Sequence, residues 1–226
     1  ISAASNSALT LATGEYVALL DHDDLLAPNA LLSIVEKILE DPNIRVLYSD
    51  EDQIDKNGNR HSPYFKPDWN PELLRGQNYF CHLCVYHRDL INQLGGFKIG
   101  TEGAQDWDLA LHATEQLDSS QIGHIAEILY HWREVPGSTA IGTKEKKYVL
   151  NASRRALEEH VKRTDLNAKI LPTKGNHWRI KHQLPKKPPL VSLLIPTRNG
   201  IEILKPCIET ILQKTSYPNY EIIIID

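Results

Sequence analysis

Methionine is absent from this 226-residue sequence, and cysteine occurs three times. A chain that lacks an initiator methionine and ends on an apolar strand pattern, 222–226, is expected to be part of a longer protein. Three cysteines (Cys81, Cys84 and Cys207) are too few for a disulfide framework, which favours a reducing, cytoplasmic compartment. No apolar run approaches the about 20 residues of a membrane-spanning helix, and there is no signal peptide. The net charge of −4 argues against a nucleic-acid partner.

The most informative stretch joins an apolar strand to a group of carboxylates. Residues 16–20 are continuously apolar, which predicts a strand buried on both faces of a parallel sheet. Ligands of such sheets bind beyond the carboxyl ends of the strands, where Asp21, Asp23 and Asp24 follow. Clustered carboxylates repel one another unless a cation or a donor-rich ligand satisfies them. We therefore expect a divalent-metal site, and the alternative is a solvated acidic turn before the next helix.

The remaining pattern predicts an α/β fold in which helices and strands alternate. Helices are expected over 2–13 (capped by Gly14), 28–40, 88–94, 105–116, 144–163 and 203–212. Strands are expected over 16–20, 45–48, 80–86, 125–130, 190–195 and 221–225, with hairpin turns at 56–59 and within 168–184. The helix over 28–40 should bury an apolar face made of Leu31, Ile34, Val35, Ile38 and Leu39. The proline-rich segment 60–78 is expected to be an ordered loop without regular structure.

Five motifs in this order resemble inverting glycosyltransferase family 2. They are Ser5-Asn6 with 12–16, Leu20-Asp-His-Asp-Asp24, Gly95-Gly-Phe97, Gln105-Asp-Trp-Asp-Leu109 and Tyr130-His-Trp-Arg133. The resemblance implies the GT-A fold and a tandem-domain enzyme of bacterial surface-polysaccharide synthesis, such as O-antigen or rhamnan. It implies the later part of one catalytic domain over 1–140, a connector over 141–188, and the start of a second domain over 189–226. We also expect the chain to lack the opening strands of the first domain, which bind the nucleotide base in this family.

The resemblance also implies roles for the carboxylates. Asp23 would bind Mn²⁺ or Mg²⁺ and Asp21 would lie near the ribose and the metal's water shell, with Asp24 a weaker candidate. Asp106 would be the base that takes the proton from the acceptor hydroxyl during inversion. The family usually has Glu before this residue, and Gln105 stands there. Asp108 is a weak candidate, because an acid in the first turn of a helix is favourable in any case.

Other residues are candidates with a structural alternative beside them. His131 would complete the metal shell and Arg133 would contact phosphate oxygens, although a His-Trp pair at a strand end is also a common packing unit. Asp50 could border the site, although a solvated hairpin entrance over 50–52 is favoured. Trp69 and Tyr64 could stack on an acceptor sugar or fix their loop to the body. Trp132 is expected in the core.

Two further predictions concern the second domain and the two neighbouring cysteines. The resemblance places Asn6, Pro196, Thr197, Asn199 and Asp226 among the donor-binding residues. Cys81 and Cys84 are expected to be buried and inert, because residues three apart in a strand face opposite sides and cannot share one metal.

The predicted function is transfer of a sugar from a nucleotide-diphosphate sugar to a glycan or lipid-linked glycan, in the cytoplasm or at the inner face of the membrane. Two alternatives remain open: a non-catalytic nucleotide-sugar-binding remnant, and an aspartyl-nucleophile phosphatase, which Leu25-Leu26 fits poorly. An alternative arrangement, in which strands 190–195 and 221–225 replace the missing strands of the first domain, also remains open.

Overall fold

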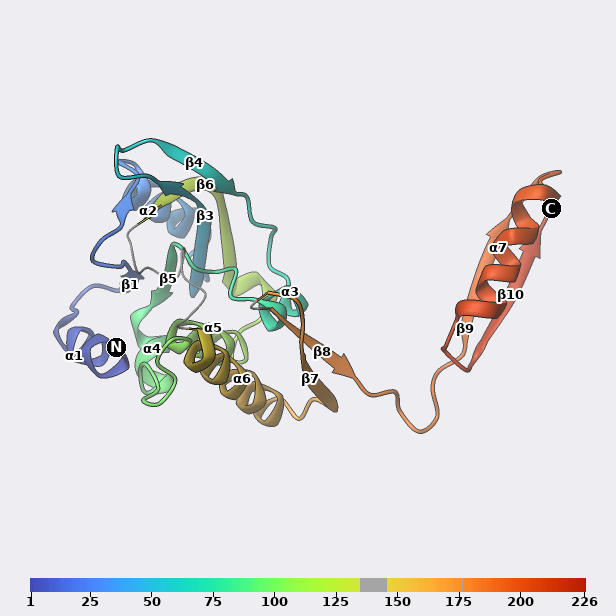
Figure 1. Cartoon of the computed structure of the whole chain (residues 1–226). Coiled ribbons are helices and arrows are strands. Elements are labelled where there is room, and N and C mark those ends of the chain that lie inside the picture. Colours follow the sequence, from blue (N-terminus) through green and yellow to red (C-terminus); the bar gives the residue numbers. More distant parts are fainter. Residues whose placement is uncertain (135–145, 176) are drawn as a thin grey trace. The chain divides into compact units, whose positions relative to one another are not determined.

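The computed structural model describes residues 1–134, 146–175 and 177–226. These fall into two compact units, 1–182 and 183–226, which are described separately (Figure 1).

The first unit is built on a mixed sheet in the order β1-β5-β3-β6-β2, with β4 paired to β3. Its strands are β1 (Tyr16–Leu19), β2 (Leu25–Leu26), β3 (Val46–Ile54), β4 (Arg60–Tyr64), β5 (Cys84–His87) and β6 (Ile122–Arg133). Its helices are α1 (Ser2–Leu11), α2 (Ala30–Glu40), α3 (Pro71–Gly76), α4 (Arg88–Leu94), α5 (Gln105–Thr114), the 3-10 helix η1 (Ser119–Gln121) and α6 (Lys146–Arg163). A hairpin of β7 (Ala168–Pro172) and β8 (Trp178–His182) follows. The predicted α/β class is confirmed.

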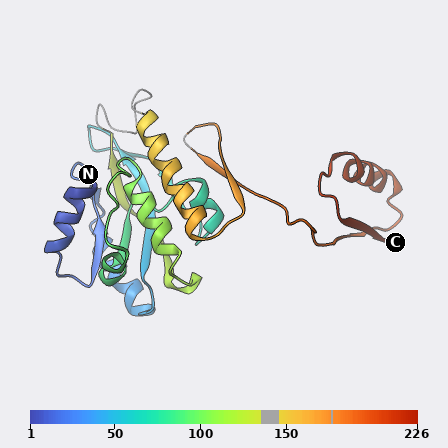
Figure 2. The same cartoon turned by 90° about the horizontal axis from the view of Figure 1, so that it is seen from below.

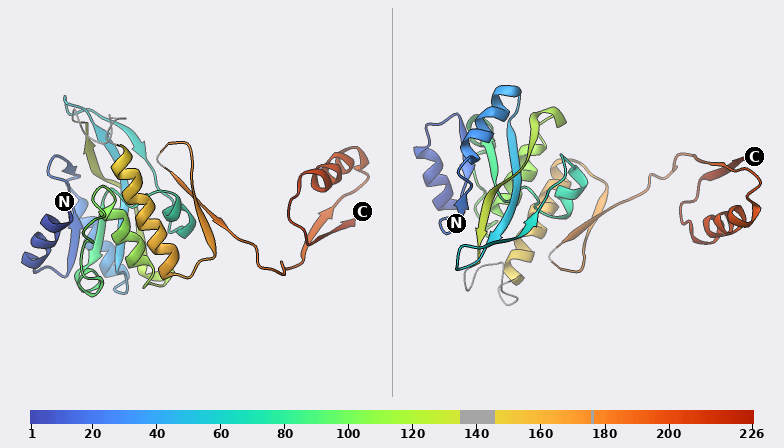
Figure 3. Two further views of the ribbon diagram at one scale, coloured as in Figure 1. Left: turned by 60° about the horizontal axis from the view of Figure 1, so that its bottom comes forward. Right: turned by 90° about the horizontal axis from the view of Figure 1, so that it is seen from above.

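Alternating residues of β3 divide the core into two halves. Val46 and Tyr48 pack with α4, α5 and α6, whereas Leu47 packs with Ile34 of α2. Successive side chains of a strand point to opposite faces, so the sheet separates α2 from the α5–α6 pair. Figures 2 and 3 show these layers.

The strand over 16–20 differs from its prediction. β1 lies at one edge of the sheet, runs antiparallel to β5 and is only partly buried, with Leu20 beyond it 50% exposed. Its apolar run therefore does not belong to a strand covered on both faces in a parallel sheet. In this sheet only β3 and β6 pair in parallel.

The acidic segment after Tyr48 is the second difference. β3 continues to Ile54, and Asp50 and Asp52 are each 3% exposed, so the solvated hairpin entrance is wrong. Asp50 accepts hydrogen bonds from the Lys66 backbone and lies 2.9 Å from Nε2 of His124. Partners inside the fold make burial of such carboxylates tolerable. The turn at 56–59 is confirmed by the β3–β4 pairing.

The segment 60–78 contains regular structure, so the prediction of a loop without regular structure is wrong. β4 occupies its start, and α3 begins at Pro71, a favourable residue at the first turn. The side chain of Asn70 caps α3 by accepting a hydrogen bond from the Leu73 amide at 2.9 Å.

Two boundaries and one face also differ. α1 ends at Leu11 with Ala12 at its C-cap, and the strand expected over 80–86 begins only at Cys84. In α2, Ile34 is buried, but Val35 and Leu39 are 50% and 74% exposed. The apolar face of α2 is therefore wider than the part of it that the sheet covers.

The described part of the predicted connector belongs to the first unit up to His182, and residues 183–188 fall in the second unit. α6 packs against α5, and β8 packs against α3. Trp178 of the hairpin lies in the main core, and its indole donates to the hydroxyl of Ser153 at 3.1 Å. Residues 135–145, which span the predicted boundary at 140, lie outside the described residues.

The second unit is the predicted β-α-β segment. β9 (Val191–Pro196) and β10 (Tyr220–Ile225) pair in parallel and are joined by α7 (Ile201–Lys214). None of the residues of α7 is buried.

Candidate functional site

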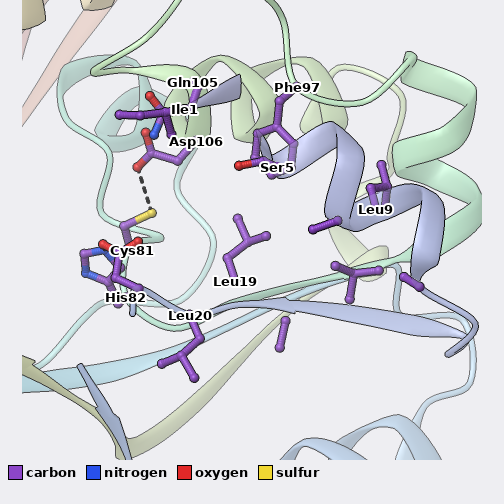
Figure 4. Close-up of a pocket in the computed structure, with 15 residues that line it drawn as sticks. Ile1, Ser5, Leu9, Leu19, Leu20, Cys81, His82, Phe97, Gln105 and Asp106 are labelled. Atoms are coloured by element: carbon purple, nitrogen blue, oxygen red, sulfur yellow. Dashed lines mark hydrogen bonds and ion pairs between the residues drawn. The ribbon is translucent and has the colours of Figure 1, made fainter. Parts of the chain in front are cut away.

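One cavity brings together residues that lie far apart in the sequence. It has a volume of about 290 Å³ and is bordered by α1, by β1 and its following residues, by the segment before β5, and by the start of α5. Its polar residues include Asp21, Cys81, His82, Gln105 and Asp106. Figure 4 shows Cys81 and Asp106 joined by a hydrogen bond, with His82 beside them. Asp21, which follows β1, and Asp106, at the start of α5, thus line the same cavity.

The three aspartates after β1 have different environments. Asp24 is buried, and its two oxygens accept hydrogen bonds from the Tyr130 hydroxyl at 2.5 Å and the Arg133 amide at 2.8 Å. Asp21 is exposed and Asp23 is half-buried. Asp24 therefore holds the segment to β6, while Asp21 and Asp23 have the more accessible carboxylates.

The pKa of Asp21 is raised. Partial desolvation is the main cause, and the charges of Asp24, Asp106 and Asp23 add to it, while nearby His82 acts in the opposite direction. A cation beside these acids would relieve this repulsion.

Asp106 lies in the first turn of α5, and one of its oxygens is held by two donors. Oδ2 accepts hydrogen bonds from Nδ2 of Asn78 at 2.8 Å and from the Cys81 thiol at 3.0 Å. Burial, followed by the charge of Asp106, raises the pKa of the Cys81 thiol well above its ordinary value, so the thiol remains a donor at neutral pH. The carboxylate therefore has a defined orientation at the cavity wall.

Cys81 and Cys84 lack the properties of a metal or redox pair. Cys84 is buried in β5, whereas Cys81 precedes the strand. Burial raises the pKa of Cys84 to about 12. The expected burial is found for Cys84 but not for Cys81, which is half-buried, and the argument from one shared strand does not apply. The inertness of the two thiols stays a prediction.

His82 is a residue of the cavity that sequence reasoning missed. Its ring stacks on Tyr130, lies 3.4 Å from Glu51 and has Nε2 3.8 Å from Asp21 Oδ2. Burial alone would lower the pKa of His82, but the hydrogen bond and charge of Glu51 raise it. The sequence offered one indication, because His82 lies between Cys81 and Cys84. The segment was expected to be a strand, but it folds as a loop before β5, so the position of His82 at the cavity was not predicted.

His131 and Arg133 are placed beside the acidic segment by the pairing of β2 with β6. Leu25 is the register partner of His131, and Nε of Arg133 donates to the Asp23 carbonyl at 2.7 Å. Nδ1 of His131 lies 2.5 Å from Asp52, which also accepts from Arg60 at 2.6 Å. A carboxylate on one ring nitrogen is the usual support of a metal-binding histidine and also suits a structural one. The metal and phosphate roles stay predictions.

Several other candidates lie outside this cavity. Both polar atoms of the Asn6 side chain pair with the backbone of Phe97 at 2.7 Å. Asp108 is buried facing α6, and burial raises its pKa. Trp69 packs against the core, which fits its structural alternative. Asp50 is held by Lys66 and His124.

The candidates of the second unit lie together at the ends of β9 and β10. Pro196 is the last residue of β9, and the Thr197 amide donates to the Ile225 carbonyl at 2.8 Å. The Asn199 amide donates to Asp226 at 3.1 Å. Their donor-binding role stays a prediction.

The described residues contain no group of three or more His, Cys, Asp or Glu side chains arranged to hold a metal. Mg²⁺ is commonly bound by one or two carboxylates together with substrate phosphates. The accessible carboxylates of Asp21 and Asp23 fit a cation that shares its coordination with a ligand's phosphates.

Comparison with known proteins relates the first part of the chain to a known family. Residues 1–95 match the family model described as Glycosyl transferase family 2. This segment is therefore similar to the glycosyltransferases of that family.

Two relatives and one solved structure are similar over nearly all of the chain. The uncharacterized protein y4gI of Sinorhizobium fredii is 44% identical over the whole chain, which covers 25% of that protein. The O-antigen biosynthesis protein RfbC of Myxococcus xanthus is 34% identical over 98% of the chain, which covers 17% of it. A mannosyltransferase of Pyrobaculum calidifontis, solved in complex with GDP-Man and Mn²⁺, is 17% identical over 95% of this chain and 60% of its own, with a TM-score of 0.40. The chain spans a quarter or less of the two relatives.

None of the helices in the described ranges is both long and apolar enough to cross a membrane.

Proposed function

We propose that this chain carries the catalytic part of an inverting glycosyltransferase that uses a nucleotide-diphosphate sugar. The observation that carries the proposal is the cavity shared by Asp21 and Asp106. An inverting transfer needs a base at the reacting carbon and a group that stabilises the diphosphate as it leaves. The family match supports assignment of these two roles to the two acids.

Asp106 is the proposed base. Its Oδ2 is occupied by Asn78 and Cys81, which leaves Oδ1 to accept the proton of an acceptor hydroxyl. A carboxylate is sufficient for this role because the hydroxyl becomes more acidic as it attacks.

Asp21 and Asp23 are the proposed cation side of the site, with His131 as a further candidate ligand. A divalent cation, Mn²⁺ or Mg²⁺, would neutralise the diphosphate of the donor. The chain's own contribution is to hold the segment rigidly, through the hydrogen bonds of Asp24 to Tyr130 and Arg133.

The proposed acceptor is a glycan or a lipid-linked glycan of a cell-surface polysaccharide, used in the cytoplasm or at the inner face of the membrane. The name of the O-antigen biosynthesis relative supports the polysaccharide context. We also propose that residues 189–226 open a second domain of the same type, in which Pro196, Thr197, Asn199 and Asp226 contact the nucleotide.

The test is a screen of UDP-, GDP- and dTDP-sugars for nucleotide release by the purified chain. We expect release from one donor class, its loss with EDTA, and its recovery with Mn²⁺ or Mg²⁺. Donor binding without release would support the non-catalytic alternative. Phosphate release from p-nitrophenyl phosphate, with no action on any sugar donor, would support the phosphatase.

A further inference from the structure

A second cavity lies on the other side of Asp106. It has a volume of about 400 Å³, within the range of roughly 300–1,000 Å³ typical of small-ligand sites. It shares Cys81, His82 and Asp106 with the first cavity and does not include Asp21. Asp106 therefore stands in a wall between two spaces, one on the side of the proposed cation and one away from it.

The lining of this second cavity suits a sugar ring. It includes the aromatic side chains of Tyr64 and Trp132 and the amides of Gln77 and Asn78. Trp132 is half-buried, and its ring centroid lies 5.8 Å from that of His82 at an angle of 50°. An aromatic ring can cover the apolar C–H face of a sugar, while amides serve its hydroxyls.

The charges of the lining indicate which sugars fit. Of the described residues that line the cavity, none is a lysine or arginine, while Glu51 and Asp106 contribute carboxylates. Lys66 lies behind this wall, buried, with its ammonium on the His82 carbonyl at 2.5 Å. Glu51 is paired with Lys66 at 3.8 Å and with His82 at 3.4 Å, so these two side chains are already engaged, and a sugar acid would meet the carboxylate of Asp106. This favours an uncharged glycan.

We propose that this second cavity binds the terminal, uncharged sugar of the acceptor glycan, with Trp132 as the stacking residue. The proposal rests on the proposed function, because Asp106 in the shared wall is the base that the acceptor hydroxyl must reach. It assigns the stacking role to Trp132, which the sequence placed in the core, rather than to Trp69.

The test measures saccharide binding by saturation-transfer NMR without donor or metal, and compares four probes. These are cellohexaose, chitohexaose and mannohexaose, which carry no acid, and a chondroitin hexasaccharide, which does. The variants are Trp132→Ala, Trp132→Phe and, as a control, Phe65→Ala, which removes an aromatic ring that is 68% exposed and outside the cavity. Circular dichroism and urea unfolding establish that each variant is folded.

We expect at least one neutral hexasaccharide to bind more tightly than the chondroitin probe. Trp132→Ala should weaken that binding on the order of tenfold, as loss of one aromatic contact implies, while Trp132→Phe should retain most of it and Phe65→Ala all of it. Absence of binding by all four probes, tighter binding of chondroitin, or equal effects of Trp132→Ala and Phe65→Ala would overturn the proposal.

A parallel assay separates this proposal from the proposed function. Nucleotide release with water as the acceptor reports the transferase without the second cavity. If no donor is cleaved while the saccharide results hold, the transferase proposal fails and the saccharide site stands. If donors are cleaved but Trp132→Ala leaves the acceptor KM unchanged, the second cavity is not the acceptor site.

Discussion

At the scale of single residues, burial separates carboxylates that hold the fold from those that can act on a ligand. Asp24, Asp50 and Asp52 are buried and paired within the protein. Asp21 and Asp106 border a cavity instead. The acids look alike in the sequence, so their different roles follow from tertiary contacts.

Cys81 offers a test of how Asp106 is held. Cys81→Ala removes one of two donors to the carboxylate, and we expect kcat for sugar transfer to fall roughly threefold to tenfold, as loss of one hydrogen bond implies. Cys81→Ser restores a donor and should recover most of the rate. Donor affinity, measured by calorimetry, should be unchanged in both variants; a fall in affinity with unchanged kcat would contradict the positioning role.

Some of these residues were predictable and others were not. Asp21, Asp23 and Asp106 stand in motifs that resemble a known family, so the sequence was sufficient to propose them, and their roles stay predictions. His82 and Asn78 were missed because they lie in a loop whose path depends on buried contacts of Lys66 and Glu51. Such contacts between distant segments leave no periodic pattern in the sequence.

At the scale of elements, α1 is attached to the glycine turn at 95–97 by Asn6. Gly96 has a φ of +78°, and a Cβ there would lie 2.5 Å from Asn6 Oδ1. Gly58 is a matched control, because its φ of +87° is similar but nothing lies within 4 Å of its added Cβ.

We expect Gly96→Ala to destabilise the protein more than Gly58→Ala. Both variants incur the cost of a left-handed backbone, on the order of 1 kcal/mol, but only Gly96→Ala also displaces Asn6. Urea unfolding gives the two free energies. Equal losses would show that the contact of α1 with the turn contributes nothing.

The contact between α5 and α6 makes the stability of the protein depend on pH. Burial alone would raise the pKa of Glu115, but hydrogen bonds from His160 and Arg163 lower it below its ordinary value. At pH values near the pKa of this carboxyl, the unfolded state therefore binds more protons than the native state. The stabilisation is complete above the ordinary pKa of about 4.5 and is lost as the pH falls through the native value.

Urea unfolding between pH 3 and 6 measures this effect. We expect Glu115→Gln to flatten the dependence of stability on pH, whereas Glu158→Gln, at an exposed position of α6, should leave it as in the parent. If the dependence of stability on pH is unchanged in Glu115→Gln, then Glu115 is not a source of the acid sensitivity.

Secondary structure was predictable where an apolar pattern extends over many residues. It was not predictable where contacts with neighbouring elements determine it. α5, α6 and the 168–184 hairpin were predicted within a few residues. The burial of β1 was not, because a continuous apolar run does not reveal whether its strand lies at the centre or the edge of a sheet. α3 was not predicted, because the proline-rich segment 60–78 was expected to lack regular structure, although proline is favourable at a helix start.

At the scale of the molecule, residues 1–182 have their own core and should fold independently. The helix and hairpin after residue 146 contribute Ala156, Leu157 and Trp178 to that core. We expect a chain ending at His182 to keep the thermal midpoint of the full chain within a few degrees. A loss of cooperative unfolding on this truncation would contradict the assignment of two units.

The central claim is that Asp106 is the base of a sugar transfer whose donor is held by the rest of the site. Asp106→Asn keeps the size of the side chain and removes its ability to take a proton. Calorimetry with the nucleotide sugar and Mn²⁺ should show donor binding unchanged, while transfer to the acceptor falls by on the order of 10²- to 10⁴-fold. Transfer at the parent rate by the Asn variant would contradict the account.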